Sequence, residues 1–172
     1  VIAILQERSS LEPLTLPGAP ENWTLALHGR YTRAEILSAV GYLTPTARPL
    51  SDSGCLPLVQ EQIEILFVTL DKSEGFDERI QYKDYAISPE RFHWQTQNRA
   101  GPNNNSGRRY TESQSNGWKF QLFVREDRGA AYVAVGPVEL VGHEGDRPIS
   151  ITWKLERPLT AELFRKFSVL RG

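Results

Sequence analysis

The chain has almost none of the residues from which disulfide frameworks, metal sites and membrane spans are built. It contains one cysteine, Cys55, no methionine and three histidines. A single cysteine excludes an internal disulfide framework and suggests a reducing compartment, so we expect a cytoplasmic protein. His28, His93 and His143 lie far apart in the sequence, which gives a zinc site little support. No apolar run approaches the roughly 18 residues that a membrane-spanning helix needs.

The common catalytic signatures are missing as well. There is no Gly-x-x-x-x-Gly-Lys phosphate loop, no Gly-x-Gly-x-x-Gly and no His-x-x-x-His. None of the five lysines has an acidic residue two positions before it, which counts against the common Asp…Glu-x-Lys nuclease arrangement. A Ser/His/Asp site assembled from distant residues stays open, because triads are defined in space. We therefore expect a binding domain without a cofactor rather than an enzyme.

Length and composition are those of one globular domain. The chain has 172 residues, of which 40% are hydrophobic and 24% are charged. Residues 1–20 end in Pro17-Gly18-Ala19-Pro20, so we expect an N-terminal arm or linker there rather than core. Residues 21–172 are expected to form a single domain. The absence of methionine, even at the first position, suggests a segment cut from a longer protein.

Charge is distributed unevenly along the chain. The net charge of −1 argues against a nucleic-acid partner. Between Ser88 and Arg125, however, six basic residues stand against two acidic ones, a net charge of +4, while the rest of the chain carries −5. A local basic face is compatible with phosphate contacts, and equally with an ordinary solvated surface. Fifteen of the twenty basic residues are arginine, whose fork fits phosphate and carboxylate.

Two helices have clear start signals. Thr32-Arg33-Ala34-Glu35 matches a capping box and predicts a helix that ends near Gly41. A Thr160 cap, followed by Leu163, Phe164, Phe167 and Leu170, predicts a C-terminal helix.

Most other regular structure is predicted to be short strands. The continuous apolar middle of residues 64–70 indicates a strand buried on both faces, and alternation at 118–125 and 149–155 indicates half-buried strands. Two more strands are expected at 131–135 and 138–141, separated by Gly136-Pro137, and a turn at 142–148. Residues 99–117 have a Gly/Pro/Asn core that predicts a long loop.

The stretch Ile80–Asn98 is the most unusual in the chain. It holds aromatic rings, a histidine, acidic side chains and side-chain amides within nineteen residues, and Ser88-Pro89 divides it into two strand-like halves. Flat rings and planar hydrogen-bonding groups are what a pocket for a nucleobase needs. Tyr and Trp are also common in sheet cores, where they only pack. Both interpretations stay open at this point.

Five segments carry a resemblance to a known family: Phe67–Glu74, Tyr82–Ser88, Phe92–Gln97, Leu122–Glu126 and His143–Leu155. This series, within about Trp23 to Leu163, resembles the C-terminal domain of large bacterial helicase proteins, many of which also carry a phospholipase-D-like nuclease domain. Some of those proteins are modification-dependent restriction enzymes. In them the domain is similar to the SET- and RING-associated readers, PUA-like β-barrels that take a 5-methylcytosine out of the duplex.

The resemblance implies a fold and a function. We expect an α+β, mainly β fold, a small PUA-like β-barrel flanked by an N-terminal and a C-terminal helix. The implied function is recognition of a modified base, 5-methylcytosine or a related one, within a restriction protein. The implied partners are double-stranded DNA and the helicase and nuclease domains of the same or a partner chain, with no membrane. The nuclease and helicase motifs are missing here, so no cutting by this segment is implied.

A flipped cytosine presents one amino donor and two acceptors, so its pocket needs an acceptor, one or two donors and an aromatic face. The candidate residues are Tyr82, Asp84, Tyr85, Phe92, Trp94, Gln95 and Gln97. Asp84 would accept from the amino group, and Gln95 or Gln97 would donate. Because side chains alternate along a strand, these residues cannot all face one pocket. We favour Tyr82, Asp84, Phe92 and Trp94 for the pocket wall, with purely structural roles as the alternative.

The loop at residues 99–117 is the candidate to enter a DNA groove, and its alternative is a flexible tip. The candidates for contacts to the DNA backbone or groove are Lys72, Arg99, Asn104, Arg108, Arg109 and Arg125. Two other functions stay in consideration beside the modified-base reader. One is a sequence-neutral DNA clamp that serves the helicase. The other is an interaction module that docks the helicase to its nuclease.

Overall fold

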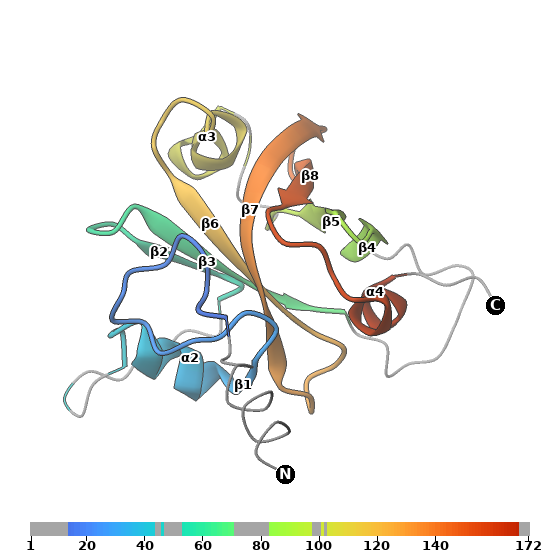
Figure 1. The fold of residues 1–172 in the computed structure, drawn as a ribbon. Helices are drawn as coiled ribbons and strands as arrows, with labels where there is room; N and C mark the ends of the chain where they lie inside the picture. The colour runs from blue at the N-terminus through green and yellow to red at the C-terminus, as the bar shows by residue number, and fades with distance from the viewer. Residues whose placement is uncertain are drawn as a thin grey trace, which may run out of the picture.

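The computed structural model describes residues 14–43, 46, 53–70, 83–97, 101 and 103–168. Within these ranges it has eight strands and three short helices (Figure 1). In chain order they are β1 (Arg30–Tyr31), α2 (Arg33–Ala39), β2 (Cys55–Leu58), β3 (Ile63–Thr69), β4 (Tyr85–Ser88), β5 (Arg91–Gln95), α3 (Asn105–Thr111), β6 (Lys119–Arg125), β7 (Tyr132–Glu144), β8 (Ser150–Leu155) and α4 (Ala161–Phe167). None of the helices among these residues is long and apolar enough to cross a membrane.

All eight strands belong to one sheet. The order is β2-β3-β6-β7-β8-β5-β4, with β1 paired to β7, and among the strands that the structure describes only the neighbours β3 and β6 run parallel. Among the described residues the end strands β2 and β4 do not pair with each other, so the sheet is open. β2 contains Pro57, which has no N–H to donate and suits an edge strand. The α+β, mainly β expectation is confirmed, whereas the expected closed barrel is wrong.

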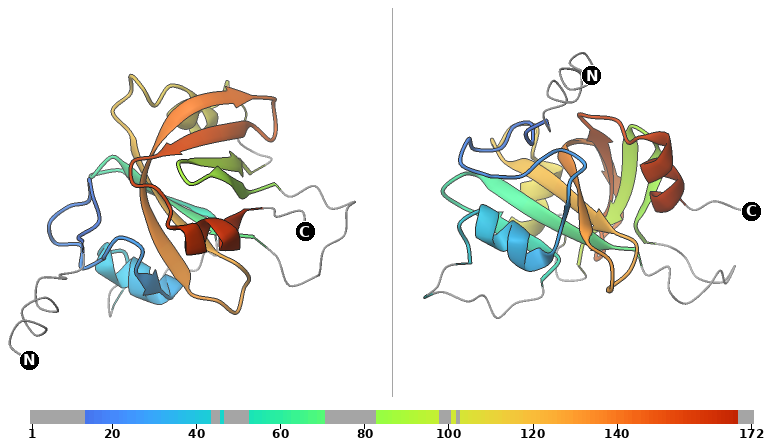
Figure 2. Two further views of the ribbon diagram at one scale, coloured as in Figure 1. Left: turned by 45° about the vertical axis from the view of Figure 1, so that its right-hand side comes forward. Right: turned by 60° about the horizontal axis from the view of Figure 1, so that its bottom comes forward.

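The open sheet nevertheless curls around one hydrophobic core on its concave side (Figure 2). Each of the neighbouring strands β3, β6, β7, β8, β5 and β4 contributes buried side chains to this core. In that order they include Leu66, Leu122, Val135, Ile151, Phe92 and Ala86. Register shifts at Leu122/Phe123 and at Leu140/Gly142 interrupt the ladders, and such bulges increase twist and bend a strand. Helix α3 contributes Tyr110 to the core, and α4 contributes Leu163 and Phe167.

A second core covers the outer face of β3 and β6. Helix α2 and the N-terminal segment pack there, which buries both faces of these strands. The half-buried character expected for 118–125 is therefore wrong, since Gln121 and Phe123 are 1% and 0% exposed. Residues 14–20, expected to belong to an arm, also enter this core: Leu16 is buried, and the Pro17 carbonyl accepts from Gln121 Nε2 at 2.8 Å. Residues 1–13 lie outside the described residues.

Local signals were reliable for the two helix caps and for the turn at Pro89. The Thr32 capping box is present at α2, Thr160 caps α4, and β4 and β5 form a hairpin that turns at Pro89. The strands expected at 131–135 and 138–141 are instead one continuous strand, β7. Gly136 adopts a φ of +98°, a conformation that glycine tolerates, and the strand continues through it. β7 also extends into the turn expected at 142–148 and ends at Glu144.

The expected loop at 99–117 contains a helix, α3. The Asn104 side chain accepts from the backbone N–H of Gly107 at 2.8 Å and so caps the first turn. Gly107 is required by packing, because a Cβ there would collide with the carbonyl oxygen of Gly101. Glycine and asparagine, which predict a loop by propensity, here serve a close backbone contact and a cap.

Candidate functional site

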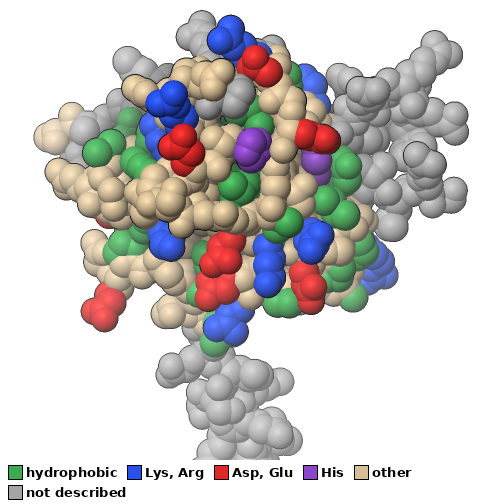
Figure 3. Space-filling model, turned by 90° about the horizontal axis from the view of Figure 1, so that it is seen from above, with side chains coloured by type: hydrophobic (Ala, Val, Ile, Leu, Met, Phe, Trp, Pro, Cys, Tyr) green, Lys and Arg blue, Asp and Glu red, His purple; other side chains and the backbone are tan. Residues whose placement is uncertain are grey.

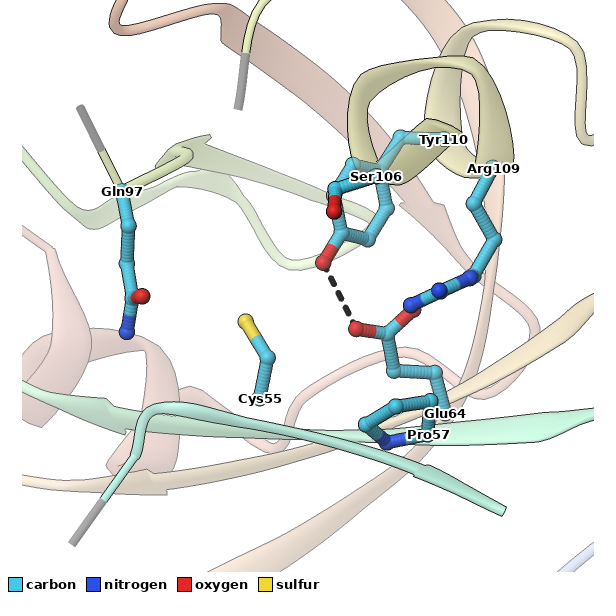
Figure 4. Close-up of a pocket in the computed structure, with 7 residues that line it drawn as sticks. All are labelled: Cys55, Pro57, Glu64, Gln97, Ser106, Arg109 and Tyr110. Atoms are coloured by element: carbon cyan, nitrogen blue, oxygen red, sulfur yellow. Dashed lines mark hydrogen bonds and ion pairs between the residues drawn. The ribbon is translucent and has the colours of Figure 1, made fainter. Parts of the chain in front are cut away.

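A pocket of about 220 Å³ lies where the two ends of the curled sheet approach each other (Figure 4). We call it the seam pocket; its lining residues are Cys55, Pro57, Glu64, Gln97, Ser106, Arg109 and Tyr110. The approach is close, since a Cβ on Gly54, just before β2, would lie 3.7 Å from Gln97 Nε2, just after β5. The polar groups of the pocket thus lie in the gap between β2 and Gln97.

Three elements position the pocket side chains. Cys55 and Pro57 on β2 and Glu64 on β3 face the concave side, where an apolar residue would otherwise extend the core. Helix α3 supplies the opposite wall. In Figure 4, Gln97 stands across the pocket from the α3 residues, with Cys55 between them.

Glu64 is a fully buried carboxylate with two partners. Tyr110 Oη donates to Glu64 Oε1 at 2.6 Å, and Arg109 Nη1 donates to Oε2 at 3.2 Å. Burial raises the pKa of the Glu64 carboxyl, while the hydrogen bond from Tyr110 and the charge of Arg109 act in the opposite direction. A buried carboxylate needs such partners, because an unpaired one would cost several kcal/mol.

Arg109 is held from more than one side. Its guanidinium lies over the Trp118 ring, with Cζ 4.8 Å from the centroid, and its side chain is 22% exposed. The Arg109 carbonyl accepts from Asn116 Nδ2 at 3.1 Å. The neighbouring Tyr110 packs edge-on against Trp94, with ring centroids 5.1 Å apart. The guanidinium is therefore placed at the pocket with little freedom to move.

The Cys55 thiol is not activated as a nucleophile in this pocket. Burial raises the pKa of the Cys55 thiol to about 12, so at neutral pH it is an uncharged, weakly polar group rather than a thiolate. Burial also raises the pKa of the Tyr110 hydroxyl. What the pocket offers are hydrogen-bond donors and acceptors beside a small apolar surface. Among the described residues, no group of three or more His, Cys, Asp or Glu could hold a metal ion.

Two rings favoured for the base pocket lie in the core instead. Phe92 is 0% exposed and Trp94 is 4% exposed, and both face the concave core from β5. Trp94 packs against Tyr110 and Trp153 there. β5 pairs with β8 over residues 91–95 and with β4 over residues 91–93, and its inward side chains pack within the concave core. These two rings therefore belong to the core and do not line the seam pocket.

The remaining predicted base-pocket residues are divided. The backbone N–H of Gln95 donates to Asp84 Oδ1 at 2.9 Å, and Gln95 Nε2 donates to Ser150 Oγ at 3.1 Å. Tyr85 stacks on His93 at 5.0 Å. None of these groups lines the seam pocket, and Tyr82 lies outside the described residues. Among the described candidates for the base pocket, only Gln97 lines the seam pocket.

The predicted DNA-contact residues are also spread out. Arg109 lines the seam pocket, Arg108 is exposed on α3, and Asn104 caps that helix. Arg125 lines a separate hollow of about 90 Å³, where its Nε donates to Thr69 Oγ1 at 2.9 Å. Lys72 and Arg99 lie outside the described residues. Seen from above, the molecule carries basic and acidic side chains interspersed on one face (Figure 3).

The sequence candidates did not include five residues of the pocket: Cys55, Pro57, Glu64, Ser106 and Tyr110. For Glu64 a signal was present. A carboxylate in a strand expected to be buried on both faces must find a partner, which makes it unusual. Ser106 and Tyr110 were concealed in a segment expected to be a loop, where no facing could be assigned.

Residues 25–167 match the model of the family described as Domain of unknown function (DUF3427). The chain belongs to this family. The matched region of the DUF3427 domain contains every residue that lines the seam pocket. It also contains all eight described strands and helices α2 to α4. A comparison with curated proteins finds no match.

Proposed function

We propose that this chain binds double-stranded DNA and takes a modified base, 5-methylcytosine or a related pyrimidine, into the seam pocket. The observation that supports this most is the facing of polar groups across a space of about 220 Å³. Gln97 stands on one side and Ser106 and Arg109 on the other (Figure 4). A flat ring with donors and acceptors on its edge is the ligand that fits such an arrangement.

The hydrogen-bonding groups match a cytosine edge. The Gln97 carbonyl accepts from the amino group, and Arg109 and Ser106 donate to the ring acceptors. Cys55 and Pro57 provide the apolar surface for an added methyl group, which contributes about 1 kcal/mol by burial. So small a gain means that steric and polar mismatch with other bases must add to discrimination.

The charge balance of the pocket supports a neutral ligand. The Glu64 carboxylate and the Arg109 guanidinium are paired at 3.2 Å, so an ionised pair adds no net charge. A free anion such as inorganic phosphate would compete with Glu64 for Arg109. An uncharged base needs only the donors that Glu64 leaves unused.

The wider context follows from the resemblance to domains of helicase and nuclease proteins. In this proposal the chain is the binding domain of a cytoplasmic, modification-dependent restriction protein, and helicase and nuclease domains supply translocation and cutting. Its relation to PUA-like readers is part of the same proposal. A sheet curled around one core, with a ligand pocket at its open seam, is compatible with that relation.

Binding isotherms with matched duplexes test the proposal. Duplexes that differ by one 5-methylcytosine are titrated at two salt concentrations, and we expect tighter binding to the modified duplex at both. Gln97→Ala should weaken binding of both duplexes, since it deletes the acceptor for an amino group that methylated and plain cytosine share, while the preference for the methyl group, which Cys55 and Pro57 contact, should remain. Gln60→Ala, which removes an exposed amide in the β2–β3 turn, is the matched control.

Two results would overturn the proposal in different ways. An affinity that falls with salt but ignores the modification would identify a sequence-neutral DNA clamp. Absence of binding to either duplex would favour an interaction module between helicase and nuclease.

A further inference from the structure

We propose that Arg109, positioned by Glu64 and Tyr110, makes the seam pocket select a cytosine-type ring over a thymine-type ring. This inference rests on the proposed function and specifies the ligand class of the same site. It assigns the discrimination to a single side chain and gives the buried carboxylate a positioning role.

The geometry presents Arg109 as a donor with a set direction. Its Nη1 donates to Glu64 at 3.2 Å, and its guanidinium lies over Trp118. The part of the chain that the structure describes gives this guanidinium no second hydrogen-bond acceptor. A guanidinium carries five N–H groups and no acceptor, so the remaining donors are available to a ligand in the pocket.

Glu64 and Tyr110 hold this donor in place. The carboxylate is 0% exposed, so its oxygens cannot turn toward solvent, and the Tyr110 hydroxyl fixes Oε1 at 2.6 Å. With Oε1 taken, Oε2 is directed at Arg109. Tyr110 is itself confined by Trp94 and Phe120, with ring centroids 5.1 and 5.5 Å away. Both residues act on a ligand through Arg109.

A fixed pure donor distinguishes two rings that are otherwise alike. 5-Methylcytosine and thymine share the ring, the methyl group and the O2 acceptor. At N3 cytosine has an acceptor, whereas thymine has an N–H donor. Arg109 can donate to O2 and N3 of the first ring but opposes the N3–H of the second. Gln97 can turn its amide to suit either ring, so it cannot make this distinction.

The test uses two duplexes of one sequence, with either 5-methylcytosine or thymine opposite the same guanine. A mismatched thymine leaves the helix more easily than a paired cytosine, so weaker binding of the thymine duplex cannot reflect the cost of flipping. We expect the unaltered chain to bind the 5-methylcytosine duplex about tenfold more tightly, the effect of one unpaired buried donor.

Three variants assign the effect. Arg109→Gln supplies both a donor and an acceptor, and we expect the ratio of the two affinities to fall below about threefold. Tyr110→Phe keeps the ring but releases Glu64, so the ratio should fall as well. Arg157→Ala, which removes an exposed arginine between β8 and α4, should keep the full ratio. If Arg109→Gln does not unfold cooperatively, Tyr110→Phe decides.

The outcomes separate this inference from the proposed function. Equal binding of the two duplexes by a chain that still prefers 5-methylcytosine to plain cytosine would overturn the inference alone. If the unaltered chain does not distinguish the 5-methylcytosine duplex from the plain cytosine duplex, the proposed function is overturned and the inference with it. A full ratio in both Arg109→Gln and Tyr110→Phe would remove Arg109 and its positioning pair from base selection.

Discussion

At the scale of single residues, burial decides what each polar group does. Glu64 is completely buried. Tyr110 donates to one of its carboxylate oxygens, and Arg109 donates to the other. Asp84, the acid favoured from sequence, instead accepts from a backbone N–H of the neighbouring strand β5. An acid that satisfies the backbone in this way shapes the hairpin rather than the pocket. Residue types alone could not show that Glu64, and not Asp84, is the acid that lines the pocket.

Asp84 should make stability depend on pH. Burial raises its pKa to about 6 from 3.8, although the hydrogen bond from Gln95 acts against the rise. Because the folded state binds the proton more tightly than the unfolded state, the stabilisation is complete below about pH 3.8 and is lost as the pH rises through about 6. Asp84→Asn should remove this loss, which denaturant unfolding between pH 4 and 7 will measure as a changing difference from the unaltered chain.

The control for this measurement is Glu139→Gln, which removes an exposed carboxylate from β7. Burial also raises the pKa of Glu64, so Glu64 contributes to the pH dependence of both proteins. Only the difference in stability between Asp84→Asn and the unaltered chain therefore isolates Asp84. A constant difference over the whole pH range would show that Asp84 does not titrate as its burial requires.

At the scale of elements, the short helix α3 is the decisive feature. It supplies three of the seven residues that line the seam pocket. Its seven residues are too few to be stable alone, so packing must hold it. Tyr110 in the core and the contact between Gly107 and Gly101 provide that packing, and the Asn104 cap adds a hydrogen bond at the first turn.

Gly107→Ala tests this contact. Helix propensity alone predicts a gain of about 1 kcal/mol for alanine. The new Cβ would collide with the Gly101 carbonyl oxygen, a backbone atom that cannot turn aside. Overpacking of this kind costs about 1–3 kcal/mol, so we expect net destabilisation in denaturant unfolding. Gly142→Ala is the control, because among the described residues no atom beyond its chain neighbours lies within 4 Å of a Cβ there. A gain in stability for Gly107→Ala would contradict the packing.

At the scale of the whole molecule, curvature brings the site together. Cys55, Pro57 and Glu64 near one end of the sheet and Gln97, just after β5 near the other end, line one pocket because the sheet wraps around the concave core. Bulges in the β6–β7 and β7–β8 ladders accompany this curvature. Among the described residues the end strands β2 and β4 do not pair with each other, and the pocket opens at the seam that this leaves.

Salt dependence of DNA binding belongs to this scale as well. If α3 lies against the duplex, exposed Arg108 beside the pocket contacts a phosphate. Arg108→Ala should then lower the slope of log affinity against log salt concentration by about 1, and weaken modified and plain duplexes alike. Arg157→Ala should leave the slope as it is. Equal slopes for both variants would place the duplex away from α3.

Much of the fold could be predicted from local signals, whereas most of the site could not. The Thr32 and Thr160 caps and the Pro89 turn involve neighbours in sequence, so they could be identified in the chain itself. For Phe92 and Trp94 the spacing indicated a common face but not whether that face was a core or a pocket. Gln97 and Arg109 were among the candidates, but nothing in the sequence indicated that they meet.

The sequence by itself determined that this is a mainly β domain with capped helices, because hydrogen bonds between near neighbours and alternation of apolar residues set local structure. The tertiary structure alone decided that the sheet stays open, that α3 forms within an apparent loop, and that a buried carboxylate directs an arginine into the seam. These outcomes depend on contacts between residues distant in the chain, and such contacts arise only when the whole sheet curls around its core.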